Sequence, residues 1–456
     1  MTEPGTGASA NVIRDAPVWA ISSALTATVL CGIGLVGLGI AFARPDLVVL
    51  GLPLVVSAAW AWDRRPGHRS RQTRGQAPVE PMVDETATLA VDLPGGPVSG
   101  SQRYSLAIRS PRGAESVRVR LRLLEGRPQD MVVTAATARE LSGSVAILHS
   151  GRQELLRIQY QLLSADGLST SEPTEPTAIV RVVPPPFQAI TSLPLPHRLI
   201  GLTGLHDSSR PGDGGEFRDL HPFVPGDRLR RIDWKATARL GRSPGDLYVR
   251  RTAATSDATV FLVVDSRDDV GENVADWDQN TPAGKGHSSL DLAREAASSI
   301  AAGYIAAGDR VGFQDLAFSG RSIATGTGSR HLQRLLRSIE LARPQGAVSA
   351  RRRAPTVQPG ALVYVLSTFL DNQAGDLAIQ YRAAGHRVIA VDVLPIPRLS
   401  QLTREAVIAF RIVSMERDDR IRATQRAGVE VLRWAGDEGS REAQLRTLAR
   451  PLRRNG

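Results

Sequence analysis

The chain contains little of the chemistry that marks an enzyme or a metalloprotein. Its 456 residues include one cysteine, Cys31, which excludes both an intrachain disulfide and a thiolate metal cluster. The eight histidines are scattered without the spacing of metal ligands, and no serine lies in a nucleophile-elbow context. Aromatic residues form only 5% of the chain, whereas 42 glycines and 29 prolines indicate many turns. We therefore expect a protein that is not an enzyme.

Charged residues are absent from Ala16 to Ala43, although 22% of the whole chain is charged. This run has about 28 residues, and a helix that rises ~1.5 Å per residue needs only ~20 to cross a bilayer. A shorter apolar run extends from Leu47 to Trp62. A cleaved signal peptide is opposed by the length of the first run, and a buried hairpin by the long absence of charge. We predict an N-terminal tail over residues 1–15 and a transmembrane hairpin over residues 16–63.

A basic linker over residues 64–85 follows the predicted hairpin, with five arginines and no acid from Arg64 to Arg74. Positive charge beside a span marks the cytoplasmic side. Because a hairpin returns the chain to its starting side, we expect the soluble domains to be cytoplasmic and attached to the plasma membrane. Contacts between these arginines and anionic lipid explain part of the net charge of +10 without nucleic acid. Another basic run, Arg351 to Arg353, is predicted to be a solvated loop, since aromatic residues do not accompany it.

The middle of the chain, residues 86–186, alternates between apolar and polar residues. From Ser116 to Leu123, Val and Leu alternate with arginines, which is typical of a strand with one buried face. Similar runs separated by turn residues occur at Tyr104–Ile108, Met131–Thr134, Val145–Leu148, Leu155–Leu162 and Ala178–Val183. This pattern predicts an all-β, sandwich-like domain.

The C-terminal part, residues 252–456, alternates between apolar strands and helical segments. Its predicted strands are Thr259–Asp265, Val311–Ala317, Ala361–Ser367, His386–Val393 and Val429–Trp434. Its predicted helices are Ser289–Ala307, Arg330–Leu341, Asp376–Ala384, Arg417–Arg426 and Glu438–Leu452. Such alternation predicts a doubly wound α/β domain with its site at the carboxyl ends of the strands.

A segment over residues 187–251 joins these two parts, and Gly214 to Arg239 within it is dense in acids, bases and aromatics. Pro225 and Gly226 suit the centre of a type II turn. Since charges near aromatic residues must be paired to be tolerated, we expect an ion-pair network under the apolar cover of Phe217, Phe223 and Trp234. The network would fix an irregular segment against a neighbouring domain or dock a partner. An anion site and an acid–base catalytic site are the alternatives.

This segment resembles the signature of the DUF58 family. The matching residues are Glu216, Phe217, Pro225, Gly226, Asp227, Arg231, Ile232, Asp233, Trp234, Lys235, Ala238 and Arg239. The chain departs from the family pattern at His221 and Phe223, where Arg and Tyr are usual, and in the strand after the motif. The resemblance implies a membrane-anchored protein with a von Willebrand factor A-like α/β domain.

The resemblance also raises the question of a metal site, because active members of that superfamily bind Mg²⁺ through Asp-x-Ser-x-Ser and later Thr and Asp residues. This chain keeps Asp265 but has Arg267 and Asp269 at the hydroxyl positions. The later acid is replaced by Thr368, with Asp371 displaced nearby, and Thr325 or Thr327 is the candidate loop threonine. Arg267 opposes a cation by its charge, so we expect no cofactor and a degenerate site. The alternative is Mg²⁺ at Asp265, Asp269 and Asp371.

We therefore expect a non-enzymatic, membrane-anchored scaffold that binds a protein partner during assembly or maturation of an envelope-associated complex. The resemblance implies that this partner is a MoxR-type AAA+ ATPase and that a transglutaminase-like membrane protein is a further partner. The alternative is a metal-dependent hydrolase with its site at Asp265 and Asp269. A nucleic-acid-binding protein is the third hypothesis and would require a continuous basic face.

Overall fold

The structure is a computed structural model, and the chain separates into two compact units. The first contains Met1–Ile147 and Arg152–Val183, and the second contains Leu148–Gly151 and Pro184–Gly456. The described residues are 11–15, 17–64, 87–94, 100–111, 114–124, 126–134, 140–164, 167, 169–197, 199, 206–243, 245–279, 286–318, 322–344, 355–399 and 402–450. Most of the basic linker and the run from Arg351 to Arg353 lie outside them.

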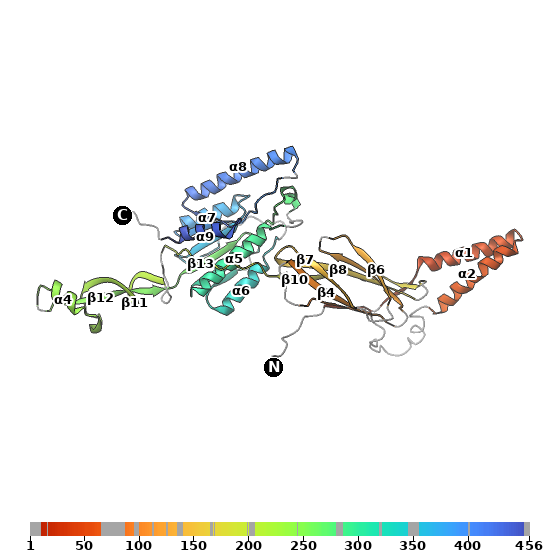
Figure 1. Cartoon of the computed structure of the whole chain (residues 1–456), viewed down its shortest axis with the longest axis horizontal. Helices are drawn as coiled ribbons and strands as arrows, with labels where there is room; N and C mark the ends of the chain where they lie inside the picture. The colour runs from red at the N-terminus through yellow and green to blue at the C-terminus, as the bar shows by residue number, and fades with distance from the viewer. Residues whose placement is uncertain are drawn as a thin grey trace. The chain divides into compact units, whose positions relative to one another are not determined.

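Two apolar helices, α1 (Ser23–Ala41) and α2 (Pro45–Arg64), form a hairpin in the first unit (Figure 1). Helix α1 begins seven residues later than Ala16, because Ser22 caps it by accepting a hydrogen bond from the Leu25 N–H at 3.3 Å. Helix α2 is longer than the apolar run, since Pro45 suits the first helical position. Both helices are long and apolar enough to cross a membrane.

Glycines bring the two helices into close contact. A Cβ atom added at Gly32, Gly39 or Gly51 would lie within 3.0 Å of atoms on the opposing helix or the connecting turn, including backbone atoms at the last two positions. The same atom at Gly34 or Gly37 would meet nothing within 4 Å. Of the four glycines in the first apolar run, two therefore permit close packing and two do not face the partner helix.

The rest of the first unit consists of two sheets. One has the strand order β1-β3-β4-β7, and the other has β2-β9-β8-β5-β6, with β10 also paired to β8. Their bounds are β1 Asn11–Asp15, β2 Trp19–Ile21, β3 Ala87–Asp92, β4 Gly100–Arg109, β5 Ser116–Leu123, β6 Gln129–Thr134, β7 Glu140–Ile147, β8 Gly151–Leu163, β9 Ser169–Ser171 and β10 Thr177–Val183. The residues predicted as an N-terminal tail thus contribute strand β1, which pairs with β3.

The two sheets share one core, as the alternation predicts. In β5, Val117, Val119 and Leu121 are buried, whereas the arginines between them are exposed. The buried residues pack with Leu89 of β3 and Leu106 of β4 from the other sheet. Arg120 pairs with Asp130 on the exposed face, with Nε–Oδ1 at 2.8 Å.

The second unit contains a six-stranded sheet with the order β15-β14-β13-β16-β17-β18. The strands are β13 Thr259–Val264, β14 Arg310–Asp315, β15 Ser322–Gly326, β16 Leu362–Ser367, β17 Arg387–Asp392 and β18 Glu430–Arg433. All pairings are parallel except that of the edge strand β15 with β14. The carboxyl ends of five strands therefore meet at one edge.

Helices cover both faces of this sheet. They are α5 Ser289–Ala306, α6 Ser329–Glu340, α7 Gln373–Ala383, α8 Arg404–Arg426 and α9 Glu438–Ala449. Val260, Leu262 and Val264 pack against α5, α6 and α9, whereas Phe261 and Val263 pack with residues of α7 and α8. The sheet is thus doubly wound, as expected, and α8 begins 13 residues before the predicted Arg417.

A two-stranded antiparallel ribbon precedes this sheet in sequence. It consists of β11 (His206–Pro222) and β12 (Tyr248–Ser256), which Figure 1 shows as a long hairpin. The 3-10 helix η2 (Leu229–Arg231) and helix α4 (Trp234–Leu240) lie between the two strands. The signature residues therefore occupy this ribbon and its connection.

Candidate functional site

The first candidate site lies at the carboxyl edge of the sheet, where Arg267 bridges two carboxylates. Asp265 follows β13, and Arg267 donates to its two oxygens from Nε and Nη2, each at 2.7 Å. Nη1 of the same guanidinium donates to Asp371 Oδ2 at 2.7 Å. Burial alone would lower the pKa of Arg267, but hydrogen bonds and attraction from Asp265, and then from Asp371, raise this pKa above its ordinary value. The guanidinium of Arg267 therefore stays charged between the two carboxylates.

The residues at this edge do not fit Mg²⁺, which requires free oxygen ligands in near-octahedral geometry. Asp265 Oδ2 accepts a further hydrogen bond from Ser367 at 2.8 Å. Asp269 points to the start of α5, where its Oδ1 accepts from the Leu290 N–H at 3.2 Å. The described residues contain no group of three or more His, Cys, Asp or Glu side chains that could hold a metal ion. Arg267 binds the carboxylates of Asp265 and Asp371, which a cation at this edge would need as ligands.

The predicted loop threonines lie away from Asp265. Thr325 is in β15, whose Gly326 pairs with Val311 of β14. Asp315 is the last residue of β14 and pairs with Val264, the residue before Asp265. Val311 is four residues earlier in β14, which corresponds to a distance of ~13 Å along the strand. Because β15 runs antiparallel to β14, Thr325 and Thr327 approach the opposite edge of the sheet. The prediction that one of them completes a metal site is therefore wrong.

A second arginine fixes the neighbouring part of the same edge. Arg417 of α8 is buried, and its Nη2 donates to Asp392 at the end of β17. Its Nε donates to the Thr368 carbonyl at 2.7 Å. Phe369, which follows, is buried and has a φ of +54°, a left-handed conformation that is uncommon for a bulky residue. Arg417 thus attaches α8 to a strained turn at the sheet edge.

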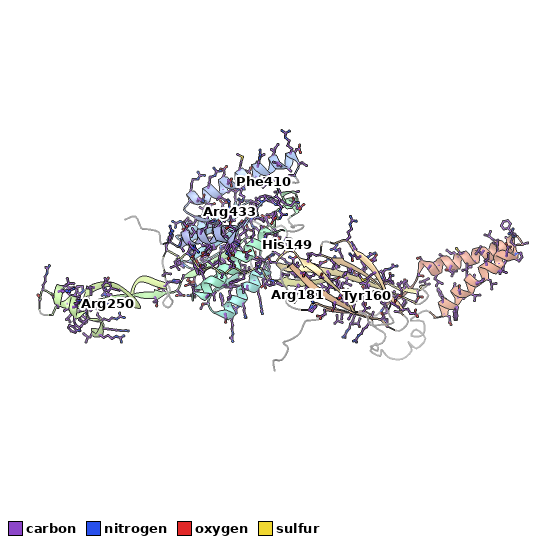
Figure 2. All side chains as sticks on the ribbon, viewed as in Figure 1. His149, Tyr160, Arg181, Arg250, Phe410 and Arg433 are labelled. Atoms are coloured by element: carbon purple, nitrogen blue, oxygen red, sulfur yellow. The ribbon has the colours of Figure 1, made fainter. Side chains whose placement is uncertain are left out.

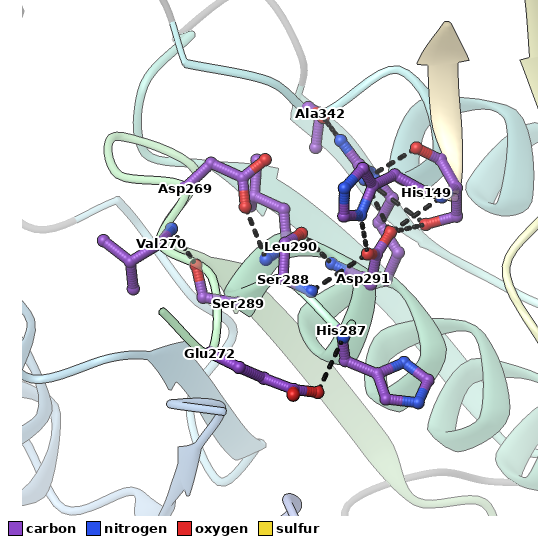
Figure 3. Close-up of polar contacts among 12 residues, drawn as sticks. His149, Asp269, Val270, Glu272, His287, Ser288, Ser289, Leu290, Asp291 and Ala342 are labelled. Atoms are coloured by element: carbon purple, nitrogen blue, oxygen red, sulfur yellow. Dashed lines mark hydrogen bonds and ion pairs between the residues drawn. The ribbon is translucent and has the colours of Figure 1, made fainter. Parts of the chain in front are cut away.

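A buried polar cluster at the start of α5 was not predicted. His149 Nδ1 lies 2.7 Å from Asp291 Oδ2, and Ser150 donates from both N and Oγ to Asp291 Oδ1 at 2.7 Å (Figure 3). Arg294 donates to the Ser150 carbonyl at 3.0 Å. Burial would raise the pKa of Asp291, but the hydrogen bond and charge of His149 bring it down to about 2. The 142 positions between His149 and Asp291 explain why sequence spacing gave no signal.

Burial also acts on the neighbouring candidate ligand, Asp269. It raises the pKa of that carboxyl, whereas the charge of Arg294 opposes the rise. Figure 3 shows Asp269 beside Leu290. Leu290 lies on the first turn of α5, as does Asp291. Both carboxylates thus accept backbone hydrogen bonds at the N-terminal turn of α5, where the helix dipole favours negative charge, but at Asp269 the effect of burial is larger.

The second candidate site is the signature tip, which we define as residues 223–247 between the ribbon strands. The predicted turn is confirmed: Gly226 has a φ of +110°, and the Asp227 N–H donates to the Val224 carbonyl at 3.0 Å. The Asp227 carboxylate accepts from the Val224 N–H at 3.0 Å. Asp233 caps α4 by accepting from the Ala236 N–H at 2.9 Å.

Further bonds attach the signature tip to β12. The Asp233 N–H donates to the Tyr248 carbonyl at 2.8 Å, and the Tyr248 N–H donates to Thr237 Oγ1 at 2.9 Å. Asp246 Oδ2 accepts from two backbone N–H groups, those of Arg242 and Ser243, at 3.0 Å each. The carboxylates of Asp227, Asp233 and Asp246 thus hold backbone turns, and Asp227 also lies 4.0 Å from Arg251.

The signature tip is therefore basic and apolar on its outside. Trp234 is 67% exposed, Leu229 is 68% exposed, and Leu240 is also exposed. The exposed cations around them are Arg228, Arg230, Lys235, Arg239 and Arg242, and Arg231 is half-buried. The expectation that Trp234 and Phe217 provide apolar cover is wrong, because both face solvent. Phe217 instead lies under Arg250 of β12, with the guanidinium carbon 5.1 Å from the ring centroid (Figure 2 labels Arg250).

Glu216 is the remaining signature residue. It lies in β11, and its side chain is outside the described part of the structure. Most of the predicted signature residues are therefore gathered at one end of one ribbon, whereas Asp265, Asp269 and Asp371 belong to the sheet and its loops. The two candidate sites use different elements of the second unit.

The architecture defines a multidomain protein with two apolar N-terminal helices, several β-sheets and an α/β part. In comparison with known families, residues 219–411 match the family described as "Protein of unknown function DUF58". This match confirms, for that part of the chain, the resemblance seen in the signature.

Mycobacterial proteins are similar to this chain. It is 29% identical over 269 residues to the uncharacterized proteins Rv1480 and MT1527 of Mycobacterium tuberculosis and Mb1516 of Mycobacterium bovis. The alignments cover 54% of this chain and 79% of each relative. No solved structure matches the chain.

Proposed function

We propose that this protein is a non-enzymatic, membrane-anchored adaptor whose signature tip binds a protein partner. The observation that carries the proposal is Trp234, which is 67% exposed on a backbone held by the capping carboxylates of Asp227, Asp233 and Asp246. Ordering an apolar side chain in solvent gains no burial within the chain itself. A binding partner that covers Trp234 would supply that burial.

The chemistry of the signature tip favours an acidic protein surface with apolar pockets. Trp and Arg are enriched among the residues that dominate binding energy at protein interfaces. The exposed cations here are mostly arginines, whose planar guanidinium binds carboxylates in a bidentate manner. The side chains of Arg230, Lys235, Arg239 and Arg242 are exposed and can present positive charge to a partner.

The DUF58 resemblance supports a MoxR-type AAA+ ATPase as this partner and a transglutaminase-like membrane protein as a second one. The doubly wound sheet supports a von Willebrand A-like fold for the α/β part. We further propose that both units lie in the cytoplasm, attached to the plasma membrane by α1 and α2, and that the complex acts in assembly or maturation near the envelope. The Arg267 bridge opposes the alternative of a hydrolase that uses Asp265 and Asp269 with a metal ion.

Affinity purification of the full chain from detergent-solubilised native membranes tests this function. We expect a MoxR-type ATPase from the same cells to co-purify, and its recovery to depend on the nucleotide that it has bound. Absence of the ATPase under every nucleotide condition would sink the adaptor proposal. A reporter at the C-terminus that is active only outside the cytoplasm would overturn the proposed orientation.

A further inference from the structure

Helix α8 carries an apolar strip on the side that faces away from its own domain. Ile408 is 52% exposed, Ile412 is 54% exposed and Met415 is 67% exposed. Their spacings of four and three residues place them on one side of the helix. Polar residues normally occupy the solvent side of a surface helix, so this strip marks a surface that another molecule covers.

The opposite side of α8 accounts for its attachment to the sheet. Phe410 meets Trp277 edge-on, with ring centroids 5.7 Å apart, and Arg417 bonds to Asp392 and to the Thr368 carbonyl (Figure 2 labels Phe410). Further along, Arg420 donates to Asn372 Oδ1 at 2.7 Å. These contacts orient the helix and fix Ile408, Ile412 and Met415 outward.

Charges on either flank of the strip indicate what covers it. In heptad terms Ile408 and Met415 take d positions and Ile412 takes a, so that Arg411 falls at g and Glu416 at e. In a parallel pair of identical helices, g of one chain meets e of the other five residues further on. Arg411 would then face Glu416 of a second copy, twice per pair. An antiparallel pair would oppose Arg411 to Arg411 and Glu416 to Glu416.

We propose that α8 mediates a parallel, two-fold symmetric contact between two copies of this chain. Ile408, Ile412 and Met415 of each copy form the apolar seam, and two ion pairs between Arg411 and Glu416 set its direction. Glu416 also lies 3.2 Å from Arg420 of its own helix, an exposed contact that leaves its other oxygen for the second copy. The dimer goes beyond the adaptor function and does not require the ATPase.

Disulfide crosslinking of the full chain in its native membranes tests this contact. The background is Cys31→Ser, which removes the single native thiol. Ile408→Cys, Ile412→Cys and Met415→Cys are introduced one at a time, with Gln380→Cys on the exposed face of α7 as the control. We expect strong self-crosslinking along the strip, above all at the central a position, and only background at residue 380.

Mixtures of two tagged chains distinguish the direction of pairing. Parallel helices give crosslinks of residue 408 with 408 and of 415 with 415, whereas antiparallel helices give 408 with 415. Arg411→Glu and Glu416→Arg should each reduce the crosslinked fraction about tenfold, and the double reversal should restore it. Restoration would also show that both substitutions are compatible with the fold, because the double variant carries them together. Background crosslinking at residue 412, dominance of the 408–415 product, or failure of the double reversal would each overturn the proposal.

Discussion

The guanidinium of Arg267 donates two hydrogen bonds of 2.7 Å to the carboxylate of Asp265, two residues before it. Both side chains are largely buried, with exposed fractions of 12% and 5%. A cation at Asp265 would have to displace this guanidinium and leave it without its partner at the sheet edge. The pair therefore stabilises the domain in the place where a metal ion would otherwise neutralise Asp265.

Removal of Arg267 should be costly. Arg267→Ala leaves a buried, uncompensated carboxylate, and such losses destabilise proteins by about 3–5 kcal/mol. Arg398→Ala provides the control, because Arg398 is 64% exposed in its pair with Glu272 and exposed pairs contribute about 0–1 kcal/mol. Denaturant unfolding of the purified protein in mild detergent measures both changes. Equal stability losses in the two variants would show that the Arg267 pair has no special structural role.

Acidification should weaken the cluster at the start of α5. The pKa of Asp291 is lowered from its ordinary value of 3.8 to about 2. Its carboxylate therefore contributes stability above about pH 4, and this contribution is lost as the pH falls toward 2, when the folded state takes up the proton. Asp291→Asn should be less stable than wild type at neutral pH and should show a smaller loss between pH 4 and 2. Parallel thermal-unfolding profiles for the two proteins across this range would contradict the assignment.

Glycine substitutions should divide the hairpin of α1 and α2 into sensitive and tolerant positions. At Gly51 a Cβ atom would lie 2.9 Å from the Gly32 carbonyl oxygen, so Gly51→Ala forces the helices apart. Overpacking of this kind costs about 1–3 kcal/mol. Gly34→Ala is the matched control, because its Cβ would meet nothing within 4 Å.

Fluorescence transfer between dyes at the two open ends of the hairpin reports this separation. Ser23→Cys and Asp63→Cys in a Cys31→Ser background provide the attachment sites. During titration with SDS, Gly51→Ala should open at a lower SDS fraction than the parent, and Gly34→Ala should not. If both variants open together, the close approach of α1 and α2 is not maintained by Gly51.

Helix α8 shows where sequence patterns were informative and where they were not. The segment from Arg417 to Arg426 was predicted to be helical, and in the structure Arg417, Ile421 and Thr424 place one side of it against the domain. The first half was missed since Ile408 and Ile412 are exposed, which blurs the difference between its two sides. A helix with apolar residues on its exposed side as well as on its buried side lacks the contrast by which an amphipathic helix is recognised in a sequence.

The signature tip gives the opposite lesson. Pro225 and Gly226 predicted their turn correctly, because this chemistry depends on local backbone geometry. The partners of Asp227 and Asp233 could not be predicted, because a carboxylate accepts equally well from an arginine or from a nearby backbone N–H. The cluster of His149 with Asp291 depends on contacts between distant segments, which residue spacing does not encode.

The affinity of the signature tip for a purified MoxR-type ATPase tests the central claim most directly. Trp234→Ala removes an exposed ring and should leave folding intact, while weakening binding by about 2 kcal/mol or more, which is roughly 30-fold. Phe187→Ala is the control, because Phe187 is 63% exposed but lies outside the signature tip. The account predicts strong loss for Trp234→Ala and wild-type affinity for Phe187→Ala. Wild-type affinity in the Trp234→Ala variant would contradict it.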